Sequence, residues 1–143
     1  MEMREELVQR TREVEQIVEK FLPEEEGYQK TVLEAMNYSV RAGGKRLRPM
    51  LMQETYRLFG GSGEEIEPFM AAIEMIHTSS LIHDDLPCMD NDQLRRGLPT
   101  AWVKFGYDMA VLAGDALLIY AVETAAKAFS MTEHADRVGR SIG

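Results

Sequence analysis

The sequence predicts an all-α fold. Apolar residues recur at helical spacing near the N-terminus, in a stripe formed by Leu7, Thr11, Val14, Val18 and Phe21. Between residues 109 and 129 most faces of the expected helix are apolar, which is typical of a helix at the centre of a bundle. No segment shows the period-two alternation of a half-buried strand.

Four of the six expected helices end at a helix-breaking residue. Pro23 and Pro87 close two of them, because proline cannot continue a helix. Glycine pairs or runs close two others. The expected helices cover residues 1–22, 27–41, 47–59, 66–86, 109–129 and 132–143, with a loop at 90–99.

Length, charge and cysteine content limit the class of protein. At 143 residues the chain is long enough for one domain with a hydrophobic core. The net charge of −8 disfavours nucleic acid as the main partner, although a local basic site can still bind an anionic substrate. The single cysteine, Cys88, excludes an intramolecular disulfide and favours a cytoplasmic location. We expect no signal peptide and no membrane span, because no run approaches the roughly 20 apolar residues required.

Four carboxylates lie close together at the end of the fourth expected helix and just beyond it: Asp84, Asp85, Asp90 and Asp92. Adjacent carboxylates repel each other, and the negative end of a helix dipole disfavours them further. A hard divalent cation such as Mg²⁺ offsets this charge, since it prefers oxygen ligands. The alternative is a solvated acidic loop. An EF-hand is excluded, because Arg95 stands where the calcium loop needs glycine.

The end of the fourth expected helix determines how these carboxylates meet. Ser80 and Asp84 share a face one turn apart, and His77 lies two turns before Asp84. Pro87 ends the helix, so the chain can turn and bring Asp90 back toward Asp84. His77 is either a ligand for an anion or a structural histidine.

Basic residues form two further clusters. Gly43-Gly44 is followed by Lys45 and Arg48, and glycine lets the backbone approach a ligand closely. Lysine and arginine bind phosphate oxygens. The segment is not a Walker A loop, because an arginine replaces the required Ser or Thr. The alternative is a helix C-cap followed by a basic turn. Arg95 and Arg96 are either phosphate ligands or members of surface ion pairs.

Two other polar residues receive no chemical role. Asp115, in the segment Ala113-Gly114-Asp115-Ala116, is interpreted as a helix cap or a buried polar tie. Cys88 has no histidine–aspartate arrangement beside it that would make it a nucleophile. The ten methionines are interpreted as core residues, although an apolar interior can also hold a hydrocarbon chain.

Four ordered motifs resemble the trans-isoprenyl diphosphate synthases. These are the farnesyl and geranylgeranyl diphosphate synthases of the bacterial and plastid type, with two extra residues in the first aspartate-rich motif. The resemblance covers nearly the whole chain from Gly27 onward. The matching segments are Gly43–Pro49, Glu74–His77, Asp84–Asp90 and Arg95–Thr100, with Leu112–Leu117 as a further match.

The resemblance implies an all-α, antiparallel helical bundle of the isoprenoid synthase type, here a partial bundle, usually in a homodimer. It also implies a trans-prenyltransferase that condenses isopentenyl diphosphate with an allylic diphosphate. Ionisation gives an allylic cation, which the double bond of isopentenyl diphosphate attacks. Mg²⁺ would neutralise the charge on the leaving diphosphate, and an apolar cavity would keep water from the cation.

The resemblance assigns roles to residues at matching positions. The expected metal ligands are Asp84 and Asp90, with Asp85 in support. The expected contact to the allylic diphosphate is Arg95. The expected ligands of isopentenyl diphosphate are Lys45, Arg48, His77 and Arg96. The positions that limit product length are Ser79 and Ser80, and two small residues there favour geranylgeranyl diphosphate or a longer product.

The resemblance also implies that residues 1–143 form the N-terminal half of a single synthase domain. Members of the family are about twice as long, and their second aspartate-rich motif has no counterpart here. Two hypotheses follow: this is part of a prenyltransferase, or it is a non-catalytic half-subunit that binds diphosphate or a partner. A terpene cyclase is a third, disfavoured by the Lys45–Arg48 segment because cyclases need no isopentenyl diphosphate site.

Overall fold

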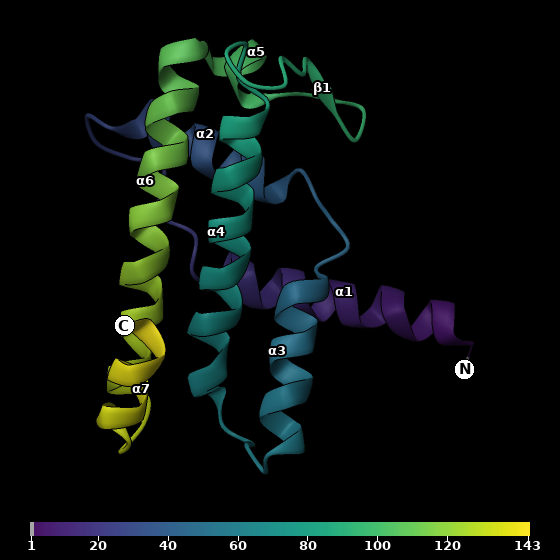
Figure 1. Ribbon diagram of the computed structural model, residues 1–143, viewed down its shortest axis with the longest axis vertical. Coiled ribbons are helices and arrows are strands. Elements are labelled where there is room, and N and C mark those ends of the chain that lie inside the picture. The colour runs from purple at the N-terminus through teal and green to yellow at the C-terminus, as the bar shows by residue number, and fades with distance from the viewer. Residues whose placement is uncertain (1) are drawn as a thin grey trace. The chain divides into compact units, whose positions relative to one another are not determined.

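A computed structural model describes residues 2–143 and is built almost entirely of helices (Figure 1). The all-α class predicted from the sequence is confirmed. The α-helices are α1 (Met3–Glu19), α2 (Lys30–Arg41), α3 (Leu47–Leu58), α4 (Glu67–Asp84), α5 (Ala101–Phe105), α6 (Tyr107–Ala126) and α7 (Ala135–Ile142). Two 3₁₀ turns, η1 (Glu64–Ile66) and η2 (Lys127–Ser130), precede α4 and follow α6.

The helices belong to two compact units. Unit 1 comprises Met1–Phe21, Lys45–Glu74 and Ala121–Gly143, and unit 2 comprises Leu22–Gly44 and Met75–Tyr120. The helices α4 and α6 each begin in one unit and end in the other.

In unit 1, α1 buries one stripe of its surface. Val14 and Val18, one turn apart, are 1% and 2% exposed. Burying a side chain of this size contributes roughly 1.5–3 kcal/mol. The predicted stripe does not continue to the start of the helix, where Leu7 is 43% exposed. Met70 of α4 is fully buried in the same unit, as expected of a core methionine.

In unit 2, α2 packs beside α5. Met36 and Val40 of α2 are buried. The ring of Tyr38 meets Phe105 of α5 edge to face, with 5.5 Å between ring centroids. The hydroxyl of Tyr38 donates a hydrogen bond to the carbonyl of Pro99, 2.7 Å away. These contacts hold α2 against the segment that carries the predicted arginines.

The loop expected at residues 90–99 contains a short β-hairpin. Its strands β1 (Leu94–Arg95) and β2 (Leu98–Pro99) are antiparallel. Arg96 and Gly97 form the two-residue turn, with φ of 50° and 78°, as a type I′ turn requires. Strands of two residues are too short to show alternation, so the sequence pattern could not reveal them.

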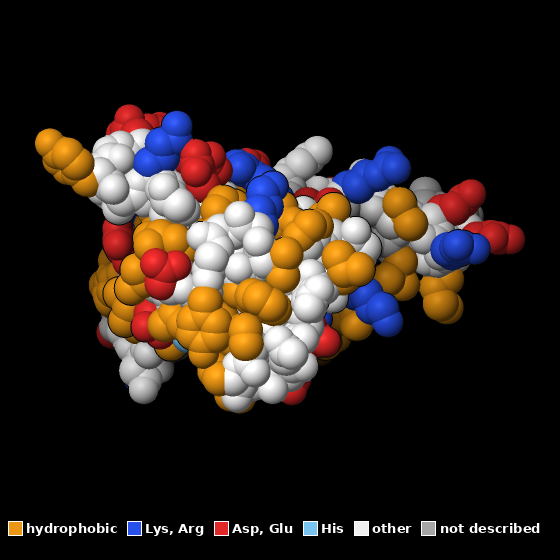
Figure 2. Space-filling view, turned by 90° about the horizontal axis from the view of Figure 1, so that it is seen from above, with side chains coloured by type: hydrophobic (Ala, Val, Ile, Leu, Met, Phe, Trp, Pro, Cys, Tyr) orange, Lys and Arg blue, Asp and Glu red, His pale blue; other side chains and the backbone are white. Residues whose placement is uncertain are grey.

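The helix α6 is unusually apolar along its length. The continuous helical stretch Tyr107–Ser130 is 24 residues long. In its most apolar part, 39% of the residues are buried. It is therefore long and apolar enough to cross a membrane, a test that the core helix of a soluble protein also passes. The expected absence of a span stays a prediction. Figure 2 shows hydrophobic side chains at the surface of one face.

Candidate functional site

The acidic turn, residues 84–92, folds back on the end of α4. Its backbone makes three hydrogen bonds across the turn. Asp90 N donates to Asp84 O over 2.8 Å, Asn91 N to Leu86 O over 3.0 Å, and Asp92 N to Asp85 O over 3.1 Å. The predicted return of Asp90 toward Asp84 is therefore present in the backbone of unit 2.

Asp85 and Arg95 form a two-pronged ion pair. Nε and Nη2 of Arg95 donate to the two carboxylate oxygens of Asp85 over 3.0 and 2.6 Å. The carboxylate is 6% exposed and the guanidinium 31%. The hydrogen bond to Asp85 raises the pKa of Arg95, against the opposing effect of burial. Asp85 therefore fixes the hairpin arginine, and its supporting role at a metal stays a prediction.

The other two predicted ligands have the chemistry that Mg²⁺ needs. Within residues 2–143, the carboxylates of Asp84 and Asp90 take part in no hydrogen bond or ion pair shown by the structure. Over the same residues, no group of three or more His, Cys, Asp or Glu side chains converges as a metal site. Mg²⁺ is usually held by one or two carboxylates, with water and substrate phosphate completing its shell. Two carboxylates on one turn fit that pattern.

Arg96 brings the hairpin against the glycine pair that ends the α2 region. Its Nη1 donates a hydrogen bond to the carbonyl of Gly43. A Cβ added at Gly44 would lie 3.3 Å from Nη2 of Arg96, so glycine leaves room for the guanidinium. Arg96 of one predicted basic cluster therefore contacts the glycine pair that precedes the other, within unit 2.

Lys45 and Arg48, which follow this glycine pair in the chain, belong to unit 1 and are exposed. Between them, Arg46 adopts a left-handed conformation with φ of 50° and is 4% exposed. Its Nη1 donates to Glu74 over 2.8 Å, and its Nε lies 3.6 Å from Glu15. Although all three cations lie in one run of sequence, Arg46 is a buried structural residue.

The remaining predicted residues lie on the second half of α4. His77 is partly exposed, and its carbonyl accepts a hydrogen bond from the hydroxyl of Ser80 over 2.7 Å. Ser79 is 4% exposed and bonds in the same way to the carbonyl of Ile76 over 2.8 Å. Both serine hydroxyls are thus satisfied by their own helix, and only Ser79 is buried.

Asp115 is neither a helix cap nor buried, which corrects the interpretation made from the sequence. It lies in the middle of α6 with its side chain 67% exposed. Its Oδ1 is 3.6 Å from Nε2 of His83. No role for His83 was predicted from the sequence, because its partner is 32 residues away and lies on another helix.

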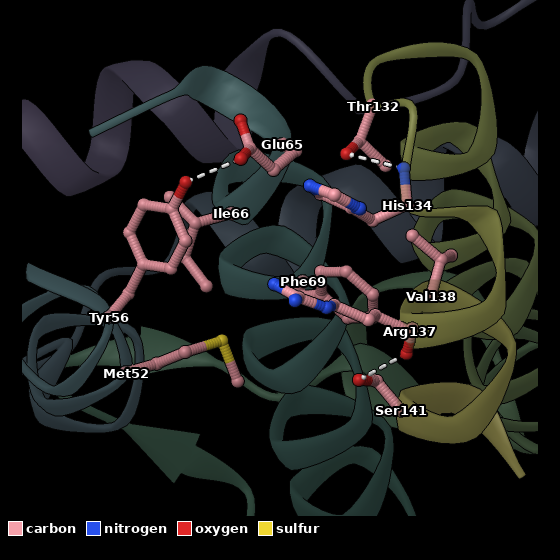
Figure 3. Close-up of a pocket in the computed structure, with 10 residues that line it drawn as sticks. All are labelled: Met52, Tyr56, Glu65, Ile66, Phe69, Thr132, His134, Arg137, Val138 and Ser141. Atoms are coloured by element: carbon pink, nitrogen blue, oxygen red, sulfur yellow. Dashed lines mark hydrogen bonds between the residues drawn. The ribbon is translucent and has the colours of Figure 1, made fainter. Parts of the chain in front are cut away.

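Unit 1 also contains a cavity of about 360 Å³ that includes none of the predicted site residues. Figure 3 shows the hydroxyl of Tyr56 pointing at Glu65, and the side chains of His134 and Arg137 lying near Phe69. The Tyr56 oxygen is 2.5 Å from Oε1 of Glu65. This hydrogen bond lowers the pKa of Glu65, whereas burial and then the same bond raise the pKa of Tyr56.

The sequence matches a known protein family over most of its length. The polyprenyl synthetase family model matches residues 29–140. The chain therefore belongs to the polyprenyl synthetase family, as the motifs indicated.

Particular relatives agree with this assignment. The chain is 56% identical over 113 residues to a chloroplastic geranylgeranyl pyrophosphate synthase of Catharanthus roseus, covering 77% of this chain and 30% of the relative. It is 50% identical over 117 residues to a geranylgeranyl diphosphate synthase of Cyanophora paradoxa, covering 82% and 38%. This chain thus spans about a third of these relatives' length.

Solved structures of the isoprenoid synthase fold are also similar. An FPP/GFPP synthase from Zymomonas mobilis superposes with a TM-score of 0.87 at 39% identity, covering 97% of this chain and 50% of that one. A geranyltransferase from Legionella pneumophila gives a TM-score of 0.87 at 33% identity, covering 97% and 48%. The helical bundle of the isoprenoid synthase type is therefore confirmed, and this chain corresponds to about half of it.

Proposed function

We propose that this chain is the part of a trans-prenyltransferase that binds the diphosphate of an allylic substrate. The observation that carries the proposal is the acidic turn, in which the backbone hydrogen bond from Asp90 N to Asp84 O brings the two carboxylate-bearing residues together. The family to which the chain belongs, and the names of its relatives, support condensation with isopentenyl diphosphate as the reaction.

Each residue at the turn then has a distinct task. Asp84 and Asp90 would hold Mg²⁺, which when bound neutralises the charge on the departing diphosphate. Arg95, fixed by Asp85, extends from β1 beside the acidic turn, where its positive charge favours a bound phosphate. A fixed guanidinium loses little side-chain freedom on binding, so its contribution is preorganised.

The isopentenyl diphosphate ligands remain Lys45, Arg48, His77 and Arg96. The hydrogen bond from Arg96 to the carbonyl of Gly43 supports the assignment of Arg96, because it joins this cation to the glycine pair of the predicted basic motif. Lys45 and Arg48 are both exposed, as a group that receives a substrate from solvent must be.

The product is proposed to be geranylgeranyl diphosphate or longer. Ser79 and Ser80 carry small side chains whose hydroxyls bond to their own helix, so neither adds bulk nor an unsatisfied polar group to the space beside α4. Product analysis by mass spectrometry decides this point, and a C15 product alone would contradict it.

A second candidate is a non-catalytic half-subunit that binds diphosphate or a partner. A homodimer is the expected assembly, which light scattering tests. The chloroplastic relatives favour a plastid over the cytoplasm predicted from the sequence, and cell fractionation tests that choice.

The two candidates are separated by one set of assays. The protein is incubated with Mg²⁺, labelled isopentenyl diphosphate and geranyl or farnesyl diphosphate, and condensation is measured. Asp84→Asn and Asp90→Asn should each lower turnover by roughly 10²–10³-fold, because charge on the leaving group is no longer offset. Asp136→Asn, an equal charge change in an exposed ion pair of α7, is the control.

The outcomes are distinct. Condensation that survives Asp84→Asn and Asp90→Asn would contradict the metal role. No condensation by the unaltered protein, together with Mg²⁺-dependent binding of inorganic diphosphate, would favour the half-subunit.

A further inference from the structure

The side chain of His83, the residue before Asp84, packs against α6 within unit 2. Its Nε2 lies 3.2 Å from the carbonyl oxygen of Val111 and 3.6 Å from Oδ1 of Asp115. A carbonyl oxygen accepts hydrogen bonds and cannot donate them, so Nε2 carries the hydrogen and points it at α6. The ring thereby ties the last turn of α4 to the middle of α6.

Gly114 allows this close approach. A Cβ added at Gly114 would lie under 3.0 Å from three ring atoms of His83, a separation that real Cβ atoms essentially never show. A glycine inside a helix costs about 1 kcal/mol relative to alanine. Gly114 is not among the residues with positive φ, so its backbone does not require glycine. An alanine at this position would displace the ring of His83 from its present place.

The turn tied by this ring carries the proposed metal ligands. Asp84 follows His83 directly, and the carbonyl of Asp84 accepts the hydrogen bond from Asp90 N. The carbonyl of His83 itself accepts from Leu86 N over 3.2 Å. A displacement of His83 therefore affects Asp84 through the peptide bond that joins the two residues. It affects Asp90 through the hydrogen bond between Asp90 N and Asp84 O.

We propose that His83 is a positioning residue whose ring, seated against Gly114, holds the acidic turn so that Asp84 and Asp90 act together. The chemical consequence rests on the proposed function, but the positioning itself can be measured without any ligand. The amide hydrogens of Asp90 and Asp92 report on the turn, since each bonds across it.

Hydrogen exchange of these two amides tests the positioning. Gly114→Ala and His83→Ala should each lower their protection roughly tenfold or more. The double variant should be no worse than His83→Ala alone, because the added methyl cannot clash with an absent ring. Gly139→Ala is the matched control, since a Cβ there would meet only Phe129 at 3.9 Å. Unchanged protection in Gly114→Ala, or a double variant that equals the product of the single effects, would overturn the proposal.

Two further measurements complete the test. If Gly114→Ala does not fold, His83→Gln replaces it: glutamine keeps an N–H donor for Val111, so it should preserve more protection than alanine, and an equal loss refutes the role. Mn²⁺ binding in the presence of inorganic diphosphate should weaken roughly tenfold in His83→Ala, as expected when ligands are misplaced, and unchanged binding would contradict the effect on the ligands. If the unaltered protein binds no Mn²⁺, the proposed function fails, while hydrogen exchange still decides the positioning.

Discussion

Replacing Arg46 by methionine is expected to destabilise unit 1 strongly. The substitution removes a guanidinium that is 4% exposed and leaves Glu74, whose side chain is 5% exposed, as a buried carboxylate without its 2.8 Å partner. Removing one member of a buried ion pair costs about 3–5 kcal/mol. At roughly 2–4 °C per kcal/mol for a chain of this size, Tm should fall by roughly 6–20 °C.

Two companion variants test the reasoning behind this magnitude. Arg46→Met combined with Glu74→Leu should recover most of the lost stability, because no buried charge remains. Glu74→Gln should cost less than Arg46→Met, since Glu15 still lies 3.6 Å from the guanidinium. Arg140→Met is the control: its pair with Asp136 is 76% and 70% exposed, so the change should be below about 0.5 kcal/mol.

The assay is urea unfolding followed by circular dichroism, with binding of inorganic diphosphate measured in parallel. Arg46→Met should lose stability. If it instead kept the stability of the unaltered protein and lost only diphosphate affinity, Arg46 would be a phosphate ligand and the structural assignment would be refuted.

Three other substitutions have predicted effects. Tyr56→Phe should weaken the pH dependence of the unfolding free energy at both acid and alkaline pH. The lowered pKa of Glu65 contributes stability above its ordinary pKa of 4.5, and this stability is lost as pH falls. The raised pKa of Tyr56 contributes stability below its ordinary pKa of 10.0, and this stability is lost as pH rises. A pH profile of unfolding free energy identical to that of the unaltered protein would contradict this. Ser80→Phe should shorten the product, because an aromatic ring at the exposed position 80 fills space beside α4. Ser79→Phe should instead lower the free energy of unfolding by about 1–3 kcal/mol, because it overpacks a buried site. Chromatography of the products and thermal unfolding measure these effects, and unchanged chain length in a folded Ser80→Phe protein would count against the assignment.

The acidic turn could be predicted from the sequence because its causes are local. The helix α4 ends at Asp84, shortly before Pro87, and a chain reversal within a few residues brings Asp90 to Asp84 without help from distant segments. The partner of Asp85 was harder to predict, because the sequence around a carboxylate does not show whether it binds a metal, an arginine or water. Only the hairpin turn at Arg96 and Gly97 aims Arg95 at Asp85.

The basic run shows the same limit. The three cations Lys45, Arg46 and Arg48 lie within four residues, so the sequence pattern does not show which of them is buried. The left-handed backbone at Arg46 turns its side chain toward Glu74, while Lys45 and Arg48 stay exposed. Burial next to a residue 28 positions away is a property of packing and not of local spacing.

The sequence alone determined the helical class, the main helix positions and the order of the family's motifs, because hydrophobic periodicity, helix-breaking residues and motif spacing are all local properties. The tertiary structure decided which polar residues are available. It committed Asp85 to Arg95, buried Arg46, and joined Arg96 to Gly43. It also placed His83 against Gly114. Each of these depends on two segments meeting in space, where charge, shape and the missing side chain of a glycine act together.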